Sequence, residues 1–198
     1  MAPGIELHVP SDLRSLYEVY EYRHAAALLY TEFPAHYAEI CDALREFRFS
    51  RAQLTESGGN ESEIPKTFSR LLRPKGWEEG RLSASLVVDS EIIQQDTHKI
   101  DYVKGRVAFD LEWNSKDQTF DRDLFAFRTF FDYNKISVGV LVTRSERLDT
   151  LFRELGIIKK YGASTTHLGK LLPRMKSGRG GGCPLLIFGI TEKLLWEG

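Results

Sequence analysis

The chain is predicted to fold as an α/β protein with a mixed sheet of five to six strands sandwiched by helices. Helix-forming stretches precede, separate and follow the β-rich segments, so helices can cover both faces of one sheet. Four β-rich segments lie in the middle of the chain and an apolar one near its end. In order, they are SASLVVD, HKIDYVK, RVAFDLEW, ISVGVLVT and PLLIFGI.

The N-terminal part is expected to be helical. Residues 12–30 place apolar side chains near one helical stripe, which predicts a first helix. Residues 34–47 predict a second helix, because Pro34 suits the first helical turn. We therefore expect a helical subregion over about 12–47.

A loop and a short helix are expected before the strands. Residues 50–65 are polar and rich in glycine, which is typical of a loop. Residues 66–77 predict a short helix, stopped by Pro74 and Gly76.

The order of the β-rich segments predicts how they pair. The first three, up to RVAFDLEW, are close in sequence, which favours an antiparallel meander. Residues 120–134 are long enough for a crossover helix, so ISVGVLVT should lie parallel to the acidic strand beside it. Residues 146–156 and 164–174 predict further short helices. PLLIFGI is nearly all apolar, as expected of a strand covered on both faces.

Composition limits the kinds of protein to which the chain can belong. The chain has 198 residues, 42% of them hydrophobic, which suits a single domain spanning 1–198 with a real core. No apolar run is long enough to cross a membrane, and residues 1–14 lack a secretory signal pattern. Cys41 and Cys183 are the two cysteines and are far apart, so we expect reduced thiols and a cytoplasmic protein. The net charge of −1 requires any nucleic-acid binding to use a local patch.

Three acids in one short stretch are the strongest functional signal. Asp110 and Glu112 are two residues apart on a predicted strand and therefore share one face, and Asp101 lies on the preceding strand. Carboxylates are costly to bury without a partner, and hard divalent cations choose oxygen ligands, so Asp101, Asp110 and Glu112 are the candidate ligands of a metal ion. From spacing alone, an ordinary reading remains open, in which Asp101 caps a turn and the other two face solvent. A glycosidase-like acid pair is less favoured, because two of the acids are adjacent on one strand.

A basic, glycine-rich segment supplies the local patch. Residues 158–179 contain six lysines and arginines and no acid, so their formal charge is +6. Lys176, Ser177 and Arg179 lie at its glycine-rich end, which suits contact with phosphates. A solvated basic face is the alternative.

Residues 101–114 resemble the active-site segment of restriction endonucleases of the BglII/BstYI group, within the PD-(D/E)XK nuclease superfamily. The resemblance extends to KGWEE at 75–79, NKISVGV at 134–140 and GRG at 178–180. It covers roughly residues 66–190, the expected catalytic core, and implies a restriction-endonuclease-like fold.

The resemblance also implies roles for the acids. Asp101 matches the metal-bridging aspartate, and Asp110 stands where the family usually has a glutamate. Glu112 occupies a position that is lysine in most of the superfamily and glutamine in close relatives. A glutamate there resembles BamHI-type sites, where it orients or deprotonates the attacking water. Glu79 lies near the position of an additional upstream polar group and completes the expected catalytic set.

DNA contacts are expected from two further places. Relatives read bases from the loop after the catalytic strand, and Asn114, Ser115 and Lys116 begin that loop here. Arg144 and Ser145 follow ISVGVLVT at a strand end near the expected cleft.

By resemblance, the chain is expected to be a Mg²⁺-dependent type II restriction endonuclease that cuts both strands of a short palindromic site. Its partners would be double-stranded DNA and a second copy in a homodimer. No membrane partner is expected. A cognate DNA methyltransferase would belong to the same system without forming a stable complex. Two alternatives stay open: another PD-(D/E)XK nuclease, in repair or acting on modified DNA, and a catalytically degenerate DNA-binding module.

Overall fold

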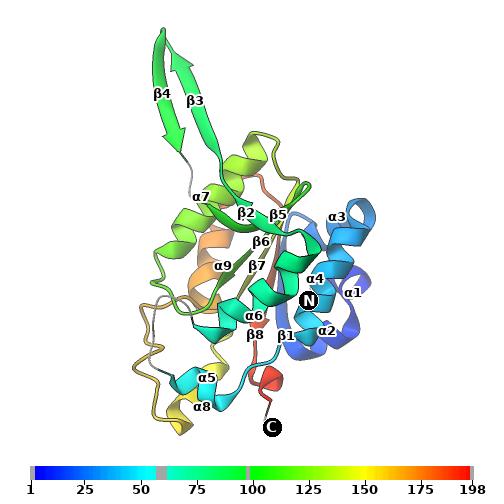
Figure 1. Cartoon of the computed structure of the whole chain (residues 1–198), viewed down its shortest axis with the longest axis vertical. Helices are drawn as coiled ribbons and strands as arrows, with labels where there is room; N and C mark the ends of the chain where they lie inside the picture. Colours follow the sequence, from blue (N-terminus) through cyan, green and yellow to red (C-terminus); the bar gives the residue numbers. More distant parts are fainter. Residues whose placement is uncertain (1–2, 57–61, 97–98, 197–198) are drawn as a thin grey trace.

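The computed structural model describes residues 3–56, 62–96 and 99–196. Within these residues, six strands form one mixed sheet in the order β1-β8-β7-β6-β5-β2, with helices on both faces (Figure 1). This architecture confirms the predicted α/β class. The strands of the sheet are β1 (Tyr17–Tyr22), β2 (Glu78–Gly80), β5 (Ile100–Lys104), β6 (Val107–Glu112), β7 (Val138–Arg144) and β8 (Leu185–Ile190).

Each face of the sheet carries its own apolar core. Helices α7 (Thr119–Asp132) and α9 (Leu168–Lys176) pack on one face, and α1 to α4, α6 and α8 pack on the other. Figure 1 shows α7 and α9 on the opposite side of the sheet from α3 and α4. The remaining helices are α1 (Pro3–His8), α2 (Ser11–Leu16), α3 (Ala25–Glu32), α4 (Pro34–Glu46), α5 (Arg51–Thr55), α6 (Glu63–Leu72), α8 (Leu148–Glu154) and the 3₁₀ turns η1 (Arg73–Lys75) and η2 (Glu192–Leu194).

The central strands pair as their sequences predict. Strands β6, β7 and β8 are buried along their whole length, as near-continuous apolar runs require. β6 runs parallel to β7, and α7 makes the crossover between them. β5 and β6 are antiparallel and joined by a tight turn, in which Gly105 has a φ of +55°. Only glycine adopts this backbone conformation readily.

The prediction of one helix over residues 12–30 is wrong. The helix α2 ends at Leu16, and β1 then pairs antiparallel with β8 at the edge of the sheet. Tyr17 and Val19 alternate inward in the strand, and the Tyr17 hydroxyl donates to the carbonyl oxygen of Leu44 at 2.8 Å. Pairing with β8 satisfies the backbone on one side of the segment, and this pairing together with the burial of Tyr17 and Val19 outweighs its weak helical stripe.

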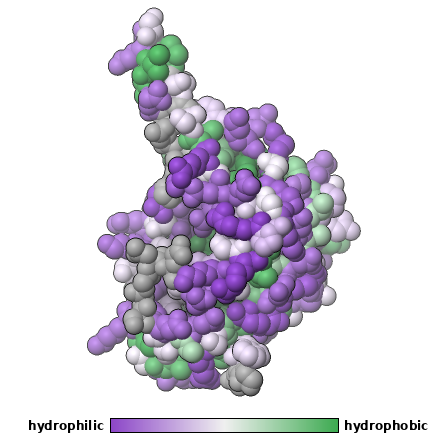
Figure 2. All heavy atoms as spheres, in the orientation of Figure 1, coloured by the Kyte–Doolittle hydropathy of each residue, from purple (hydrophilic) through white to green (hydrophobic). Residues whose placement is uncertain are grey.

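The predicted meander is also only partly right. SASLVVD does not pair with β5, whose outer neighbour is the short strand β2. Instead β3 (Ser83–Val88) pairs with β4 (Glu91–Asp96) in a separate hairpin that extends away from the body (Figure 1). Asp89 and Ser90 both have positive φ, as a two-residue hairpin turn requires. Figure 2 shows hydrophobic residues gathered near the tip of the hairpin, and Val87, Val88, Ile92 and Ile93 are exposed there.

The polar segment 50–65 is not wholly a loop. Ser50 accepts a hydrogen bond from the backbone N–H of Gln53, and the Gln53 side chain accepts one from the N–H of Ser50. This capping box begins the short helix α5. Residues 57–61 of the expected loop lie outside the described residues. No helix in the described part of the chain is both long and apolar enough to cross a membrane.

Candidate active site

The strand β6 presents two carboxylates to α7. Asp110 and Glu112 lie on the same face as Ala108, which belongs to the core beneath α7, while Phe109 belongs to the opposite core. Across the parallel ladder, Asp110 is opposite Leu141 on β7. Asp110 is 3% exposed and Glu112 is 8% exposed. The expectation that both acids share one face is confirmed, and the expectation that they might face solvent is not.

Asp101 approaches from the neighbouring antiparallel strand. Tyr102 on β5 pairs with Phe109 on β6, so Asp101 and Asp110 are adjacent across the two strands. The two carboxyl groups are within hydrogen-bonding reach of each other. Asp101 is exposed, unlike Asp110. The pair therefore joins a buried carboxylate to one that faces solvent.

A fourth carboxylate comes from α7 and was missed by sequence reasoning. Asp123 is 1% exposed, and its carboxyl group is within hydrogen-bonding reach of that of Glu112. The signal was present in the helix, because Asp123 stands three residues after Phe120 and four before Phe127, both fully buried. An acid in the buried stripe of an amphipathic helix indicates a polar site beneath it.

Burial sets the electrostatics of this carboxylate cluster, which we define as Asp101, Asp110, Glu112 and Asp123. Burial is the largest cause raising the pKa of Asp110 well above its ordinary value, followed by the negative charge of Asp101. Burial likewise raises the pKa of Glu112, although the Ser115 hydroxyl opposes this shift. The pKa of Asp123 rises to about 9, chiefly by burial and then by the charge of Glu112.

Few hydrogen bonds offset the burial of these groups. Asp110 Oδ1 accepts one from the backbone N–H of Leu111 at 3.0 Å. Glu112 Oε2 and Asp123 Oδ2 are buried without a hydrogen-bond partner. The half-exposed Arg122 guanidinium lies 3.8 Å from Asp123 Oδ1. Burial is costly for the ionised forms, so at neutral pH protons offset part of the negative charge of the cluster, and a divalent cation could take their place.

The donor chemistry of the cluster fits a divalent cation. Among the described residues, no three His, Cys, Asp or Glu side chains are arranged to hold an ion by themselves. Mg²⁺ is usually bound by one or two carboxylates, with waters and substrate phosphates completing its shell. The two adjacent carboxylate pairs, Asp101 with Asp110 and Glu112 with Asp123, match that requirement.

The Glu79 side chain is engaged by two cationic side chains. It lies on the edge strand β2, and its carboxylate is 2.9 Å from Arg81 Nε and 3.1 Å from Lys99 Nζ. Hydrogen bonds from these two side chains lower the pKa of Glu79, with Arg81 the larger cause. Its charge is thus already balanced at the sheet edge.

The loop after β6 is held against a second loop. Lys116 forms an antiparallel bridge with Thr165, and the Ser115 carbonyl oxygen accepts from the N–H of Thr166 at 2.9 Å. The Asn114 amide donates to the carbonyl oxygen of Lys160 at 3.4 Å. Of the three loop residues predicted to contact DNA, Lys116 has the exposed side chain.

Arg144 and Ser145 do not lie on the surface, contrary to the expectation that they contact DNA. Arg144 is 1% exposed and donates to the carbonyl oxygen of Tyr161 at 3.1 Å and to the Thr165 hydroxyl at 2.6 Å. The Ser145 hydroxyl accepts from the backbone N–H of Arg147 at 3.0 Å. A guanidinium buried in this way supports the loop at 161–165 and is not available to a phosphate.

The basic segment is partly neutralised by acids distant in the sequence. Arg174 lies 3.3 Å from Asp117 and 3.1 Å from Asp121, and Arg179 also pairs with Asp121. Lys160 donates to the carbonyl oxygen of Leu54. The full +6 charge is therefore not displayed to a ligand, while Lys176, Ser177 and Arg179 keep exposed side chains.

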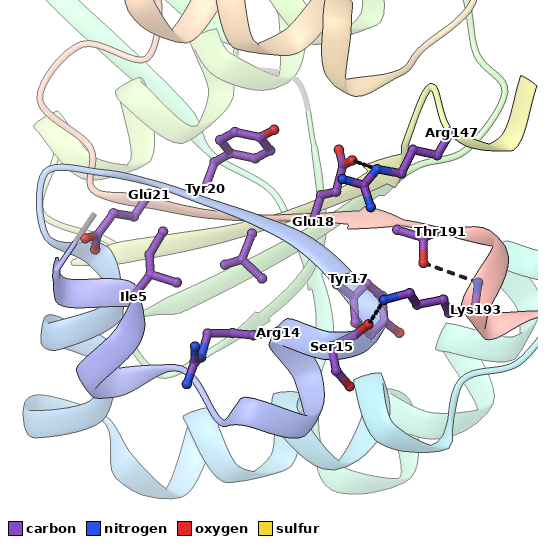
Figure 3. Close-up of a pocket in the computed structure, with 11 residues that line it drawn as sticks. Ile5, Arg14, Ser15, Tyr17, Glu18, Tyr20, Glu21, Arg147, Thr191 and Lys193 are labelled. Carbon is purple, nitrogen blue, oxygen red and sulfur yellow. Dashed lines mark hydrogen bonds and ion pairs between the residues drawn. The ribbon is translucent and has the colours of Figure 1, made fainter. Parts of the chain in front are cut away.

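A cavity of about 390 Å³ lies along β1, away from the carboxylate cluster (Figure 3). Its charged side chains are already engaged. Arg147 pairs with Glu18, and Lys193 Nζ donates to the carbonyl oxygen of Ser15 at 2.8 Å. None of the four acids of the cluster lines this cavity, so we place the candidate active site at the cluster.

Comparison with known proteins identifies a matching family. The model of the family described as restriction endonuclease BglII/BglIII matches residues 17–190, which is most of the chain. No curated protein matches the chain significantly.

The raised pKa values predict an unusual pH dependence of stability without metal. The pKa of Asp123 is about 9 in the fold and 3.8 ordinarily, so its contribution is fully present below pH 3.8 and is lost as the pH rises toward 9. In EDTA, raising the pH from 6 to 9 should lower stability on the order of 2 kcal/mol, or about 4–8 °C in melting temperature. The same measurement on Asp123→Asn should give a flatter profile.

Asp132→Asn is the matched control, because Asp132 is a solvent-exposed acid on the same helix. It should keep the wild-type profile. An identical pH profile for wild type and Asp123→Asn would contradict the electrostatic picture of the cluster.

Proposed function

The chain belongs to the BglII/BglIII restriction endonuclease family, and we propose that it hydrolyses both strands of a short palindromic DNA site with Mg²⁺ at the carboxylate cluster. The observation that carries the proposal is the meeting of Asp101, Asp110 and Glu112 at adjacent strands. The exposed Asp101 gives a phosphodiester access to a cluster that is otherwise buried.

In this proposal the acids have two different roles, metal binding and proton transfer. Asp101 and Asp110 would hold the cation, whose chemistry when bound would be to make water more acidic and to offset negative charge on the departing oxygen. Glu112 orients the attacking water and accepts its proton. Burial raises the pKa of Glu112, and a base whose pKa is closer to the operating pH is a better proton acceptor. Glu79 is left out of the proposed catalytic set because Arg81 and Lys99 already engage it.

DNA contact is proposed for the surface around the cluster. Lys116 and the glycine-rich end of the basic segment, with Lys176, Ser177 and Arg179, have exposed side chains for phosphates. Asn114 and Ser115 are proposed to set the position of the base-reading loop. Arg144 is proposed as a support of that region and not as a DNA contact.

Cleavage of both DNA strands favours a dimeric assembly. One subunit contributes one carboxylate cluster, so matched cuts in two strands favour a homodimer with two-fold symmetry. We propose that the enzyme acts in the cytoplasm, where Cys41 and Cys183 would remain the unbridged, buried thiols seen here. A cognate DNA methyltransferase would protect host sites without a stable complex.

Asp101→Asn tests the proposed function. The variant should lose cleavage of a phage genome by at least about 10²–10³-fold, because one electrostatic contact to the transition state is removed. Specific DNA binding in Ca²⁺ should remain detectable by gel shift. Glu79→Gln is the control and should cut at nearly the wild-type rate. Full cleavage by Asp101→Asn would refute the assignment of the site.

Lys176→Ala tests the proposed phosphate contact. Affinity should fall for specific and unrelated duplexes alike, because a phosphate contact carries no base information. The slope of log affinity against log salt should lose about 0.9 in magnitude, the value for one contact. Binding titrations at several salt concentrations measure this slope, and an unchanged slope would place Lys176 outside the interface.

A further inference from the structure

The β3–β4 hairpin forms a sheet of its own, apart from the main sheet. Its two six-residue strands pair with each other, and Figure 1 shows them extending beyond the body of the protein. A two-stranded hairpin is marginally stable at best in water, and independent stability takes three or more strands with an apolar face. A further strand or surface would therefore stabilise this hairpin.

The tip of the hairpin carries apolar side chains on both of its faces. Val87 and Ile92 are directly opposite each other, and each is 65% exposed. Val88 and Ile93 lie on the other face, because side chains alternate along a strand, and they are 42% and 46% exposed. Figure 2 shows these hydrophobic residues gathered near the tip. An exposed apolar patch of this kind marks an interaction site.

The strands of the hairpin lack the usual protection against pairing with another strand. Natural proteins protect exposed strand edges with lysine, with proline or with bulges. Residues 83–96 contain no lysine, arginine or proline. The register of β3 and β4 is also continuous along all six pairs, without a bulge. The outer edges are thus suited to the addition of a strand.

The charge of the hairpin favours a protein partner over DNA. Residues 83–96 include the three acids Asp89, Glu91 and Asp96 and no lysine or arginine, so their formal charge is −3. Contact with DNA phosphates needs positive charge. Two of these acids, Asp89 and Glu91, lie at the tip.

The base of the hairpin has the complementary charge. Arg81 and Lys99 flank the hairpin in the sequence, and both contact the single carboxylate of Glu79, at 2.9 and 3.1 Å. These three side chains therefore have a formal charge of +1. An acidic tip would lie beside such a base if two hairpins ran side by side in opposite directions. A two-fold axis generates this antiparallel arrangement, because it relates identical surfaces.

We propose that the β3–β4 hairpin is a dimerisation arm, which pairs along its outer edge with the arm of a second copy to form one four-stranded sheet. The inference rests on the proposed function, which requires a homodimer, and it names the surface that joins the two copies. The added strands supply cross-strand neighbours for the apolar side chains. A standard interface takes about 20–30 residues from each partner, and the two strands with their turn provide roughly half of that number.

Sedimentation velocity of the full-length protein without DNA tests the arm. Wild type should be a dimer. Ile92→Asp should weaken dimerisation about tenfold or more, because each dimer then loses two apolar contacts and gains like-charge repulsion. Leu7→Asp is the control, since Leu7 is a 77% exposed apolar residue on α1, and it should stay dimeric. A wild type that is monomeric at every concentration would overturn the proposal, as would equal dimerisation of Ile92→Asp and wild type.

An amine–thiol cross-linker locates the contact. Cys41 and Cys183 are buried, so Ser90→Cys places an accessible thiol at the tip. Six residues of strand separate the tip from the base of the same arm by about 20 Å. A shorter cross-linker therefore joins the tip to a base only between copies. Mixed isotopically light and heavy protein should give hybrid cross-links from position 90 to Lys99. Hybrid cross-links only to lysines elsewhere would contradict the arm-to-arm pairing.

The outcomes are distinct from those that test the proposed function. Dimerisation that depends on Ile92, in a protein that cuts no DNA, would uphold the arm and refute the nuclease reaction. DNA cleavage that depends on Asp101, with dimerisation indifferent to Ile92, would do the reverse. Weaker DNA binding by Ile92→Asp with unchanged dimerisation would identify DNA as the ligand of the hairpin and overturn the proposal.

Discussion

The cost of ionising buried carboxyl groups is the constraint on which the functional half of this structure depends. Asp110, Glu112 and Asp123 meet between a sheet and a helix, where unpaired negative charge is weakly screened. A fold holds such groups only if the surrounding packing is strong. Here the long buried strands β6, β7 and β8 and the phenylalanine-rich α7 supply that packing. The same packing keeps the acids from moving apart.

The surroundings of the cluster are arranged around one open side. Asp101 on β5 is exposed, and we propose that a substrate reaches the buried acids from there. The buried Arg144 side chain donates a hydrogen bond to the segment at 161–165 and so supports it. That segment in turn forms a β-bridge with the loop after β6. Asp117 and Asp121 fix Arg174 in the same way. Supporting ion pairs and surface charges thus have different roles, although the sequence shows both as basic residues.

Sequence reasoning succeeded where local periodicity decides the structure. Alternation placed Asp110 and Glu112 on one face, and the apolar runs at 138–144 and 185–190 identified the central strands. It failed where long-range pairing decides. Residues 17–22 become a strand only because β8 offers an edge, and Arg144 is buried by a loop distant in the sequence. Periodicity alone does not single out Asp123, because one acid in an amphipathic crossover helix ordinarily faces solvent, and only packing against β6 buries it.

The central proposal is that the carboxylate cluster binds the divalent cation of the nuclease reaction. Anomalous diffraction from crystals of the full-length protein grown with Mn²⁺ locates the ions directly. The proposed function predicts a peak that touches Asp101 and Asp110. Ions bound elsewhere, such as beside Glu79, with none at the carboxylate cluster, would contradict it.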